Sequence, residues 1–400
     1  MISRAIYVQG SRKLTIELER IDTWLTDSTS VINFPGLVEL DGDRLYMTYH
    51  RARHGVLEGE PLVSVVSENI GKTWKEVPLD FPLLDRHPAT GKNFVDFGSG
   101  ILGRLSDGTI CRIDTQAVDN EKLAVDQSNK DYLLVEQTRF RWRSWTSNGD
   151  HIETYVFEVE GVPWGPCFYE NYSRLIELDN GDLITALEVH VGEPRTDGPT
   201  TSNGKETVKY RFSTSIIRSS DGGRTWRFVT AFHPWDVNPV YGKADREADD
   251  GLCEPDLAVL PNGDLLCMMR TGSYSPMFQA RSTDGGTTWS MPQTTGWQGV
   301  KPRLEVLPNG VLACAAGRGQ YGHPQVTHVM LSLDGTGEYW EYPFAFHTGP
   351  GCSYTSTMQR NGQLHVIYSH SDFTQEFGAN SLPTQAIKCA VLDVKLETSS

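Results

Sequence analysis

The chain has 400 residues, of which 38% are hydrophobic and 10% aromatic, enough apolar material for a folded core. Lys and Arg number 36 against 51 Asp and Glu, and the resulting charge of −15 argues against a nucleic-acid-binding protein, which needs clustered cations. No run approaches the roughly 18 apolar residues of a membrane-spanning helix. Because the first residues also lack a signal-peptide pattern, we expect a cytoplasmic protein, or a secreted one whose signal peptide is not part of this sequence.

In chain order, the first recurring feature is a short apolar run, a polar turn with glycine, and a second apolar run. The pattern is typical of a β-hairpin. It occurs six times, with its turn glycine at Gly42, Gly108, Gly181, Gly263, Gly310 and Gly362.

A second phrase, Ser-X-Asp-X-Gly-X-Thr-Trp, alternates with these hairpins. It is complete at residues 219–226 and 282–289, weaker at 67–74, and carries one inserted residue at 332–340, with a trace at 144–150. Asp and Gly favour a tight turn, the carboxylate and hydroxyls can bond to local backbone, and the Trp can pack beneath. Each copy, an Asp box, is therefore predicted to connect two strands.

Together the two phrases predict six four-stranded units, uninterrupted by any convincing amphipathic helix. We expect an all-β protein, a six-bladed β-propeller formed as one domain by residues 1–400, with residues 3–18 closing the ring against the last blade. The seven cysteines show neither CxxC spacing nor an even number, so they are expected to be reduced and mostly buried. No motif calls for a metal or another cofactor.

The hairpins and Asp boxes, over roughly residues 20–395, resemble the sialidase (neuraminidase) superfamily of BNR-repeat propellers. Residues 252–270 resemble the segment that supplies an active-site glutamate and arginine, here Glu254 and Arg270, and residues 352–368 the segment that supplies a catalytic tyrosine, here Tyr354. The resemblance implies that Tyr354 is a nucleophile and Glu254 its base. This is chemically sensible because a phenol with a pKa of about 10 needs an adjacent base at neutral pH.

The turn glycines also serve as a ruler for residues at one end of the propeller axis. Eight or nine positions before them lie Asn33, Ser99, Tyr172, Glu254, Lys301 and Tyr354, and the second strands end near His50, Gln116, Glu188, Arg270, Arg318 and His370. We predict that these polar groups converge around a ligand, the alternative being strand ends that are simply solvated.

The resemblance further implies three arginines that hold a substrate carboxylate, but only Arg270 matches. Asn33 and Gln325 stand where the other two are expected, which predicts weak binding of sialic acid unless Arg318, Arg303 or Lys301 substitutes. The general acid would come from the segment after Arg51 and Arg53, as Glu58 or Glu60.

The leading hypothesis is an exo-acting glycoside hydrolase for a sialic-acid-like or other acidic or deoxy sugar, with a small glycan as its substrate. Aromatic residues before blade 3 and in the segment 233–241 favour a sugar ligand. One alternative is a polysaccharide lyase for a uronate, in which His50 or Tyr354 abstracts a proton and Arg51 or Arg270 neutralises the carboxylate. The other is a glycan-binding propeller without catalysis.

Overall fold

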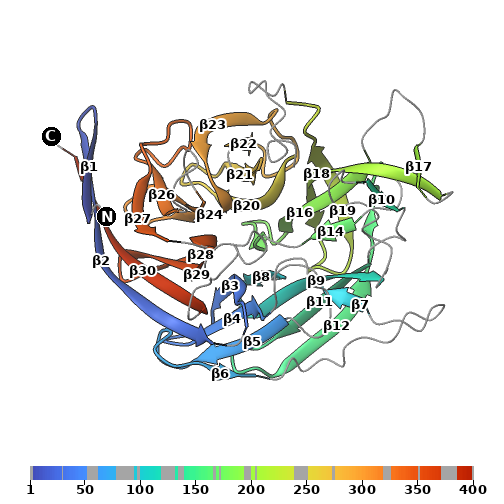
Figure 1. Cartoon of the computed structure of the whole chain (residues 1–400), viewed down its shortest axis with the longest axis horizontal. Helices are drawn as coiled ribbons and strands as arrows, with labels where there is room; N and C mark the ends of the chain where they lie inside the picture. The colour runs from blue at the N-terminus through green and yellow to red at the C-terminus, as the bar shows by residue number, and fades with distance from the viewer. Residues whose placement is uncertain are drawn as a thin grey trace.

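A computed structural model of the chain describes residues 3–28, 30–51, 62–77, 94–96, 100–118, 131–133, 139–164, 168–170, 173–192, 200–202, 205–237, 251–272, 275–318, 326–349, 352–370 and 385–398. Over these residues the regular structure consists of strands, which form six sheets around one axis (Figure 1). The strands pair antiparallel, except for the short parallel pair of β13 (Val159–Glu160) and β19 (Trp226–Phe232). The expected six-bladed β-propeller is confirmed.

Each sheet is one blade, counted along the chain. Blade 1 contains β3 (Asn33–Glu39), β4 (Leu45–His50), β5 (Leu62–Ser67) and β6 (Lys75–Glu76). Blade 2 contains β7 (Phe94–Asp96), β8 (Ile101–Arg104), β9 (Ile110–Val118), β11 (Arg139–Trp145) and β12 (His151–Phe157). Blade 3 contains β15 (Ile176–Glu177), β16 (Leu183–Gly192), β18 (Lys205–Ser219) and β19 (Trp226–Phe232), with short additions β10 (Asp131–Leu133), β13 (Val159–Glu160), β14 (Phe168–Glu170) and β17 (Thr200–Ser202).

The remaining blades follow the same order from the axis outward. Blade 4 contains β20 (Cys253–Val259), β21 (Leu265–Arg270), β22 (Pro276–Ser282) and β23 (Gln293–Gln298). Blade 5 contains β24 (Val300–Val306), β25 (Leu312–Gly317), β26 (Val326–Ser332) and β27 (Phe344–Thr348). Blade 6 contains β28 (Cys352–Arg360), β29 (Gln363–His370), β30 (Gln385–Thr398), β2 (Arg12–Asp27) and β1 (Arg4–Gln9).

The two ends of the chain close the ring together. Strand β2 pairs with β30 in a register that sets Leu14 against Leu396, and the N- and C-terminal segments lie side by side in Figure 1. Leu14 and Ile16 are fully buried in the cluster that also contains Leu392, so the closure is apolar as well as hydrogen-bonded. The expected closing strand is confirmed, and it continues to Asp27.

The Asp boxes join the third and fourth strands of their blades. Gly223 N donates to Ser219 Oγ (2.9 Å), Thr225 N donates to Asp221 Oδ1 (2.9 Å), and the buried Trp226 donates from Nε1 to Gly223 O (2.7 Å). The copy at 282–289 repeats all three bonds. The boxes thus act as rigid connectors, as the sequence predicts.

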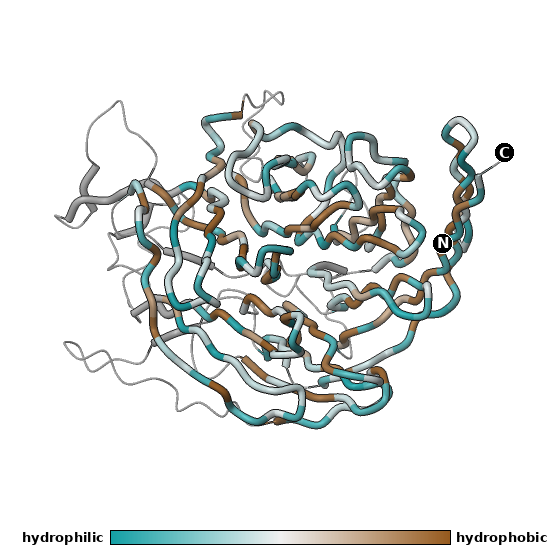
Figure 2. The backbone as a smooth tube through the Cα atoms, turned by 180° about the vertical axis from the view of Figure 1, so that it is seen from behind, coloured by the Kyte–Doolittle hydropathy of each residue, from teal (hydrophilic) through white to brown (hydrophobic). Residues whose placement is uncertain are grey.

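Buried apolar residues of neighbouring blades form shared clusters, such as Ile184 of blade 3 with Leu265 of blade 4. Figure 2 shows hydrophobic (brown) and hydrophilic (teal) stretches alternating along the chain. The five described cysteines with a placed side chain are buried free thiols, as expected: Cys111, Cys253, Cys267, Cys314 and Cys389. Among the described residues, no helix is long and apolar enough to cross a membrane.

Candidate functional site

Bulges interrupt the innermost strands of blades 1, 4, 5 and 6 at equivalent places. The register with the second strand shifts after Asn33, Cys253, Val300 and Cys352. The next residue in three of these strands, namely Phe34, Glu254 or Lys301, has a positive φ of 57°, 44° or 48° and precedes a proline. Side-chain-bearing residues in this left-handed conformation cost about 1–3 kcal/mol each and concentrate at functional sites. The bulges mark this end of the axis as the candidate site.

Glu254 is the centre of a buried hydrogen-bond network that crosses three blades. Its Oε1 accepts from Arg270 Nη1 (2.6 Å), and its Oε2 accepts from the backbone N of Lys301 (2.8 Å). Its own backbone N donates to Glu188 Oε2 (2.7 Å). Each carboxylate therefore holds the bulge of the next blade, which stabilises the strained backbone that carries the site.

Tyr354 of blade 6 meets Glu254 of blade 4 across the axis, as the sequence predicts for next-but-one blades. The Tyr354 phenol is hydrogen-bonded to the Glu254 side chain. The Tyr354 ring also lies 4.1 Å from the Phe34 ring, centroid to centroid, and the Arg318 guanidinium carbon lies 5.8 Å from the Tyr354 centroid. Phe34 and Arg318 thereby fix a buried phenol beside a carboxylate and two guanidinium groups.

Burial and charge separate the pKa values of these groups. Burial, with the charge of Glu254, raises the pKa of Tyr354 well above its usual value, although Arg270 and Arg318 oppose the shift. Burial alone would raise the pKa of Glu254, but Arg270 and Lys301 outweigh it and lower that pKa. Burial also lowers the pKa of the Lys301 amine well below its usual value. Glu254 is therefore ionised at neutral pH, with Arg270, Lys301 and Arg318 among the groups that stabilise its carboxylate.

From the sequence, Glu188 stands out only as one of the polar residues near the ends of the second strands, with no role of its own. Burial and the nearby charge of Glu254 raise its pKa to about 8, so it is largely protonated at neutral pH. His190 Nε2 lies 3.5 Å from its Oε1. One sequence signal marks the bulged positions of the innermost strands, a large residue followed by proline. It occurs in Phe34-Pro35, Glu254-Pro255 and Lys301-Pro302.

The comparisons with known proteins agree with the propeller fold. Residues 169–366 match the model of the BNR repeat-like domain, and no curated protein matches the chain. A Dyadobacter fermentans protein of unknown function superimposes with a TM-score of 0.64 and 18% identity, covering 95% of this chain and 99% of that one. The Hadza microbial sialidase Hz136 superimposes with a TM-score of 0.62 and 16% sequence identity, and the match covers 90% of this chain but only 65% of the sialidase chain. The intramolecular trans-sialidase of Ruminococcus gnavus superimposes with a TM-score of 0.58 and 14% sequence identity, and the match covers 94% of this chain and 97% of that one.

The chain is a six-bladed β-propeller with the sialidase-like fold, and its residues 169–366 match the BNR repeat-like domain. At these identities the likeness to the solved structures establishes the architecture, and the chemistry has to be argued from the side chains.

Of the other predicted site residues, His50 and Asn33 lie beside Phe34, whereas Arg51 makes its contacts elsewhere. The His50 ring is 5.2 Å from Phe34, and Asn33, which is buried, pairs with His50 in the strand ladder. Arg51 binds Tyr49, Glu76 and Asp27, so its described contacts belong to β2 and blade 1 and not to Glu254. Six predicted site residues lie outside the described residues: Arg53, Glu58, Glu60, Ser99, Tyr172 and Gln325.

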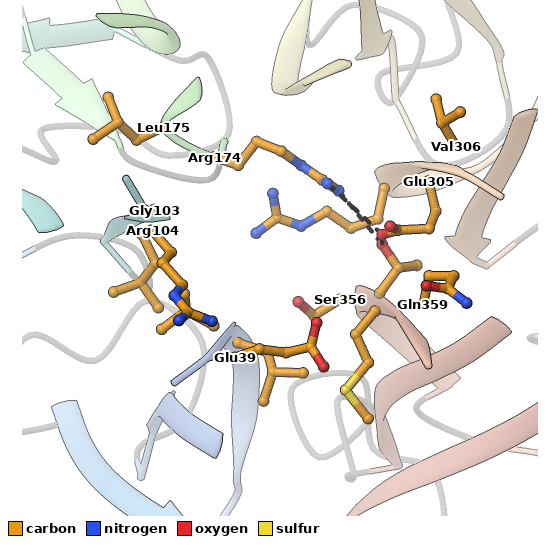
Figure 3. Close-up of a pocket in the computed structure, with 15 residues that line it drawn as sticks. Glu39, Gly103, Arg104, Arg174, Leu175, Glu305, Val306, Ser356 and Gln359 are labelled. Carbon is orange, nitrogen blue, oxygen red and sulfur yellow. Dashed lines mark hydrogen bonds and ion pairs between the residues drawn. The ribbon is translucent and has the colours of Figure 1, made fainter. Parts of the chain in front are cut away.

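A cavity of about 370 Å³ lies at the opposite end of the axis, where the innermost strands end (Figure 3). Glu39 and Arg104 line one side of it, and Arg174 extends toward Glu305 on the other. Beneath them, Asp256 accepts from Arg174 Nε and Nη2 (3.1 and 2.9 Å) and from Arg303 Nη1 (2.7 Å). Arg303 therefore does not join the Glu254 network, and this ionic cluster joins blades 3, 4 and 5 instead. In the described part of the chain, no group of three or more His, Cys, Asp or Glu side chains is placed to hold a metal ion.

Proposed function

We propose that the propeller is an exo-acting glycoside hydrolase for a sugar that carries an acidic group, of the sialic-acid-like or related deoxy class. The observation that carries the proposal is the buried contact between Tyr354 and Glu254, with Arg270 on the carboxylate and Arg318 over the phenol ring. A phenol beside a carboxylate is a nucleophile with its base, and two guanidinium groups suit an anionic substrate.

In the proposed reaction, the Tyr354 oxygen attacks the anomeric carbon and the bond to the leaving-group oxygen breaks. The phenolic proton goes to Glu254, and the leaving group takes a proton from an acid for which the sequence offers Glu58 or Glu60. Water then gives a proton to the deprotonated Glu58 or Glu60 and displaces the Tyr354 oxygen, which recovers its own proton from Glu254. Two displacements at one carbon predict net retention of configuration.

An anionic substrate would also activate the base. Arg270 and Arg318 are among the charges that lower the pKa of Glu254, which makes it a weak proton acceptor. A substrate carboxylate on these guanidinium groups offsets their charge and raises the pKa of Glu254 toward that of a useful base. The acidic group of the substrate would then promote catalysis as well as binding.

The test is a panel of fluorogenic glycosides that carry sialic acids, uronic acids or neutral sugars. We expect turnover of an acidic glycoside by the wild type and its loss in Tyr354→Phe. Tyr46→Phe is the matched control, because it removes another buried phenol oxygen, bonded to Ser64 in blade 1. A conjugated double bond formed from a uronate glycan would indicate the lyase, and binding of glycans without turnover of any substrate would indicate the non-catalytic propeller.

A further inference from the structure

One tryptophan of the propeller presents its ring to solvent. All ten tryptophans lie in described segments, and of these only Trp235 is exposed, at 41%. Its ring stacks on the His233 imidazole with 4.5 Å between centroids and 10° between planes. An isolated exposed apolar residue needs no explanation, but a stacked pair with one face open has the form of a binding platform.

The contacts around His233 hold this platform rigid. Asp236 closes the turn, because its backbone N donates to His233 O (3.0 Å) and its Oδ2 accepts from His233 N (3.1 Å). His233 Nδ1 lies 2.8 Å from Ser213 Oγ, and the Trp164 ring meets the imidazole edge-on at 5.8 Å. Because burial lowers the pKa of His233, the imidazole beneath the indole is neutral at pH 7. The exposed face of Trp235 is therefore fixed before any ligand arrives, which reduces the entropy cost of binding.

The platform lies on the same end of blade 3 as the Glu254 network. Glu188 is on β16, next to Val189, which pairs with the Ser213 that supports His233 on β18. Since His233 follows β19, two strand spacings separate the platform from β16, roughly 10 Å. Leu252, two residues before Glu254, donates from its backbone N to Phe212 O on β18 (2.9 Å). Strand β18, which supports His233, is thus hydrogen-bonded to the segment that carries Glu254.

We propose that Trp235, stacked on His233, binds a sugar ring on the leaving-group side of the substrate. An exposed indole face matches the apolar C–H face of a pyranose, and the separation from Glu188 corresponds to the length of a short oligosaccharide. The inference rests on the proposed function for its geometry and names the substrate more closely: an acidic sugar joined to a glycan, not to a small aglycone.

Binding is measured first without turnover, so that the two proposals can fail separately. The full-length Tyr354→Phe protein is run on native gels that contain polygalacturonan or sialylated submaxillary mucin. We expect retardation in at least one gel, its loss on Trp235→Ala, and its partial return on Trp235→Phe. Tyr339→Ala, which removes another exposed aromatic ring on the Asp box of blade 5, should leave it unchanged. Absence of retardation in both gels, or equal retardation after Trp235→Ala, would overturn the platform.

Kinetics with an otherwise active enzyme separate the outcomes further. For an oligosaccharide substrate, Trp235→Ala should raise KM about tenfold with little change in kcat, and a methylumbelliferyl glycoside of the same sugar should be unaffected. Equal effects on both substrates would contradict a leaving-group site. If the wild type hydrolyses nothing but shows Trp235-dependent retardation, the platform stands and the hydrolase proposal fails.

Discussion

Glu188 and Glu254 belong to one hydrogen-bond network, yet their pKa values move in opposite directions. Glu254 has Arg270 and Lys301 beside it, so its carboxylate is stabilised. Glu188 is buried next to the charge of Glu254, which favours its protonated form. Two neighbouring carboxyl groups divided in this way into an ionised base and a neutral acid are typical of catalytic sites.

This division predicts a pH dependence of stability. The unfolded Glu188 ionises near pH 4.5 but the folded group only near 8, so the folded state binds more protons between these values and its stability falls as pH rises. Glu188→Gln can still accept a hydrogen bond from the Glu254 backbone, and it should remove this pH dependence. The difference in free energy of unfolding between Glu188→Gln and the wild type should therefore shift in favour of the variant by on the order of a few kcal/mol from pH 5 to pH 8. Urea unfolding at both pH values measures the difference, with Glu338→Gln on an exposed turn as control. Parallel curves for wild type and Glu188→Gln would contradict the prediction.

The reacting pair predicts strong non-additivity. Tyr354→Phe and Glu254→Gln should each reduce kcat by roughly 10³-fold or more, and the double variant should be little worse than either, because nucleophile and base act as one unit. Glu254→Gln also removes the carboxylate that Arg270 binds, so rates are compared at a temperature where circular dichroism shows all variants folded. A near-normal rate for Glu254→Gln eliminates the pair. Loss of activity in His50→Ala, with Tyr354→Phe unaffected, favours the lyase.

The guanidinium groups predict substrate preference. Arg270 and Arg318 act on Glu254 and Tyr354, whereas Asn33 and Gln325 stand where the resemblance expects the other arginines. Ordinary N-acetylneuraminic acid glycosides should therefore be hydrolysed weakly or not at all. A fluorogenic sialoside assay alongside an established sialidase provides the measurement, and comparable kcat/KM values would show that the assignment of these two positions is wrong.

Among the elements, the Asp boxes could be predicted most fully, because their bonds are local. In the weaker copy at 67–74, Ile70 has a φ of 55° at the position where the complete boxes have Gly222 and Gly285, so this copy contains a strained backbone that glycine would avoid. The Tyr354–Glu254 contact was predictable from the repeat spacing. The bulges were not, since a one-residue shift of register leaves no period in the sequence, and Phe34 was therefore missed in favour of Asn33.

The Asp box also provides a matched pair of glycine substitutions. Gly222 and Gly223 both have positive φ, but a Cβ at Gly222 would meet no atom within 4 Å, whereas one at Gly223 would lie 2.9 Å from the Trp142 ring. Gly222→Ala should cost only the left-handed backbone, about 1 kcal/mol, and Gly223→Ala distinctly more. Chemical unfolding compares the two variants. Equal losses would mean that the packing of Trp142 does not constrain the box.

At the scale of the whole molecule, two devices hold the ring of blades together. One is the β2–β30 pairing at the outer edge of blade 6, which unites the ends of the chain. The other lies at the axis, where Asp256 of blade 4 binds Arg174 of blade 3 and both Arg303 and the backbone N of Leu304 in blade 5. The printed backbone bonds between blades are isolated ones, as from Leu175 N to Leu102 O (2.9 Å) between blades 3 and 2. A buried carboxylate that accepts from the blades on both sides is therefore an effective additional link.

Asp256→Asn should therefore destabilise the whole propeller and not one blade alone. It leaves the buried Arg303 guanidinium without its counter-charge and Arg174 with Glu305 alone, and loss of one partner of a buried pair typically costs about 3–5 kcal/mol. Burial alone would raise the pKa of Asp256, but Arg174 and Arg303 lower it, so its contribution is present above the unfolded pKa and is lost as pH falls toward the folded value. The gap between wild type and Asp256→Asn should accordingly be wide at pH 7 and narrow in acid. Asp264→Asn breaks a more exposed pair with Arg281 and should cost no more than about 1 kcal/mol. If the two variants unfold at the same urea concentration at pH 7, the axial cluster does not join the blades in the way argued here.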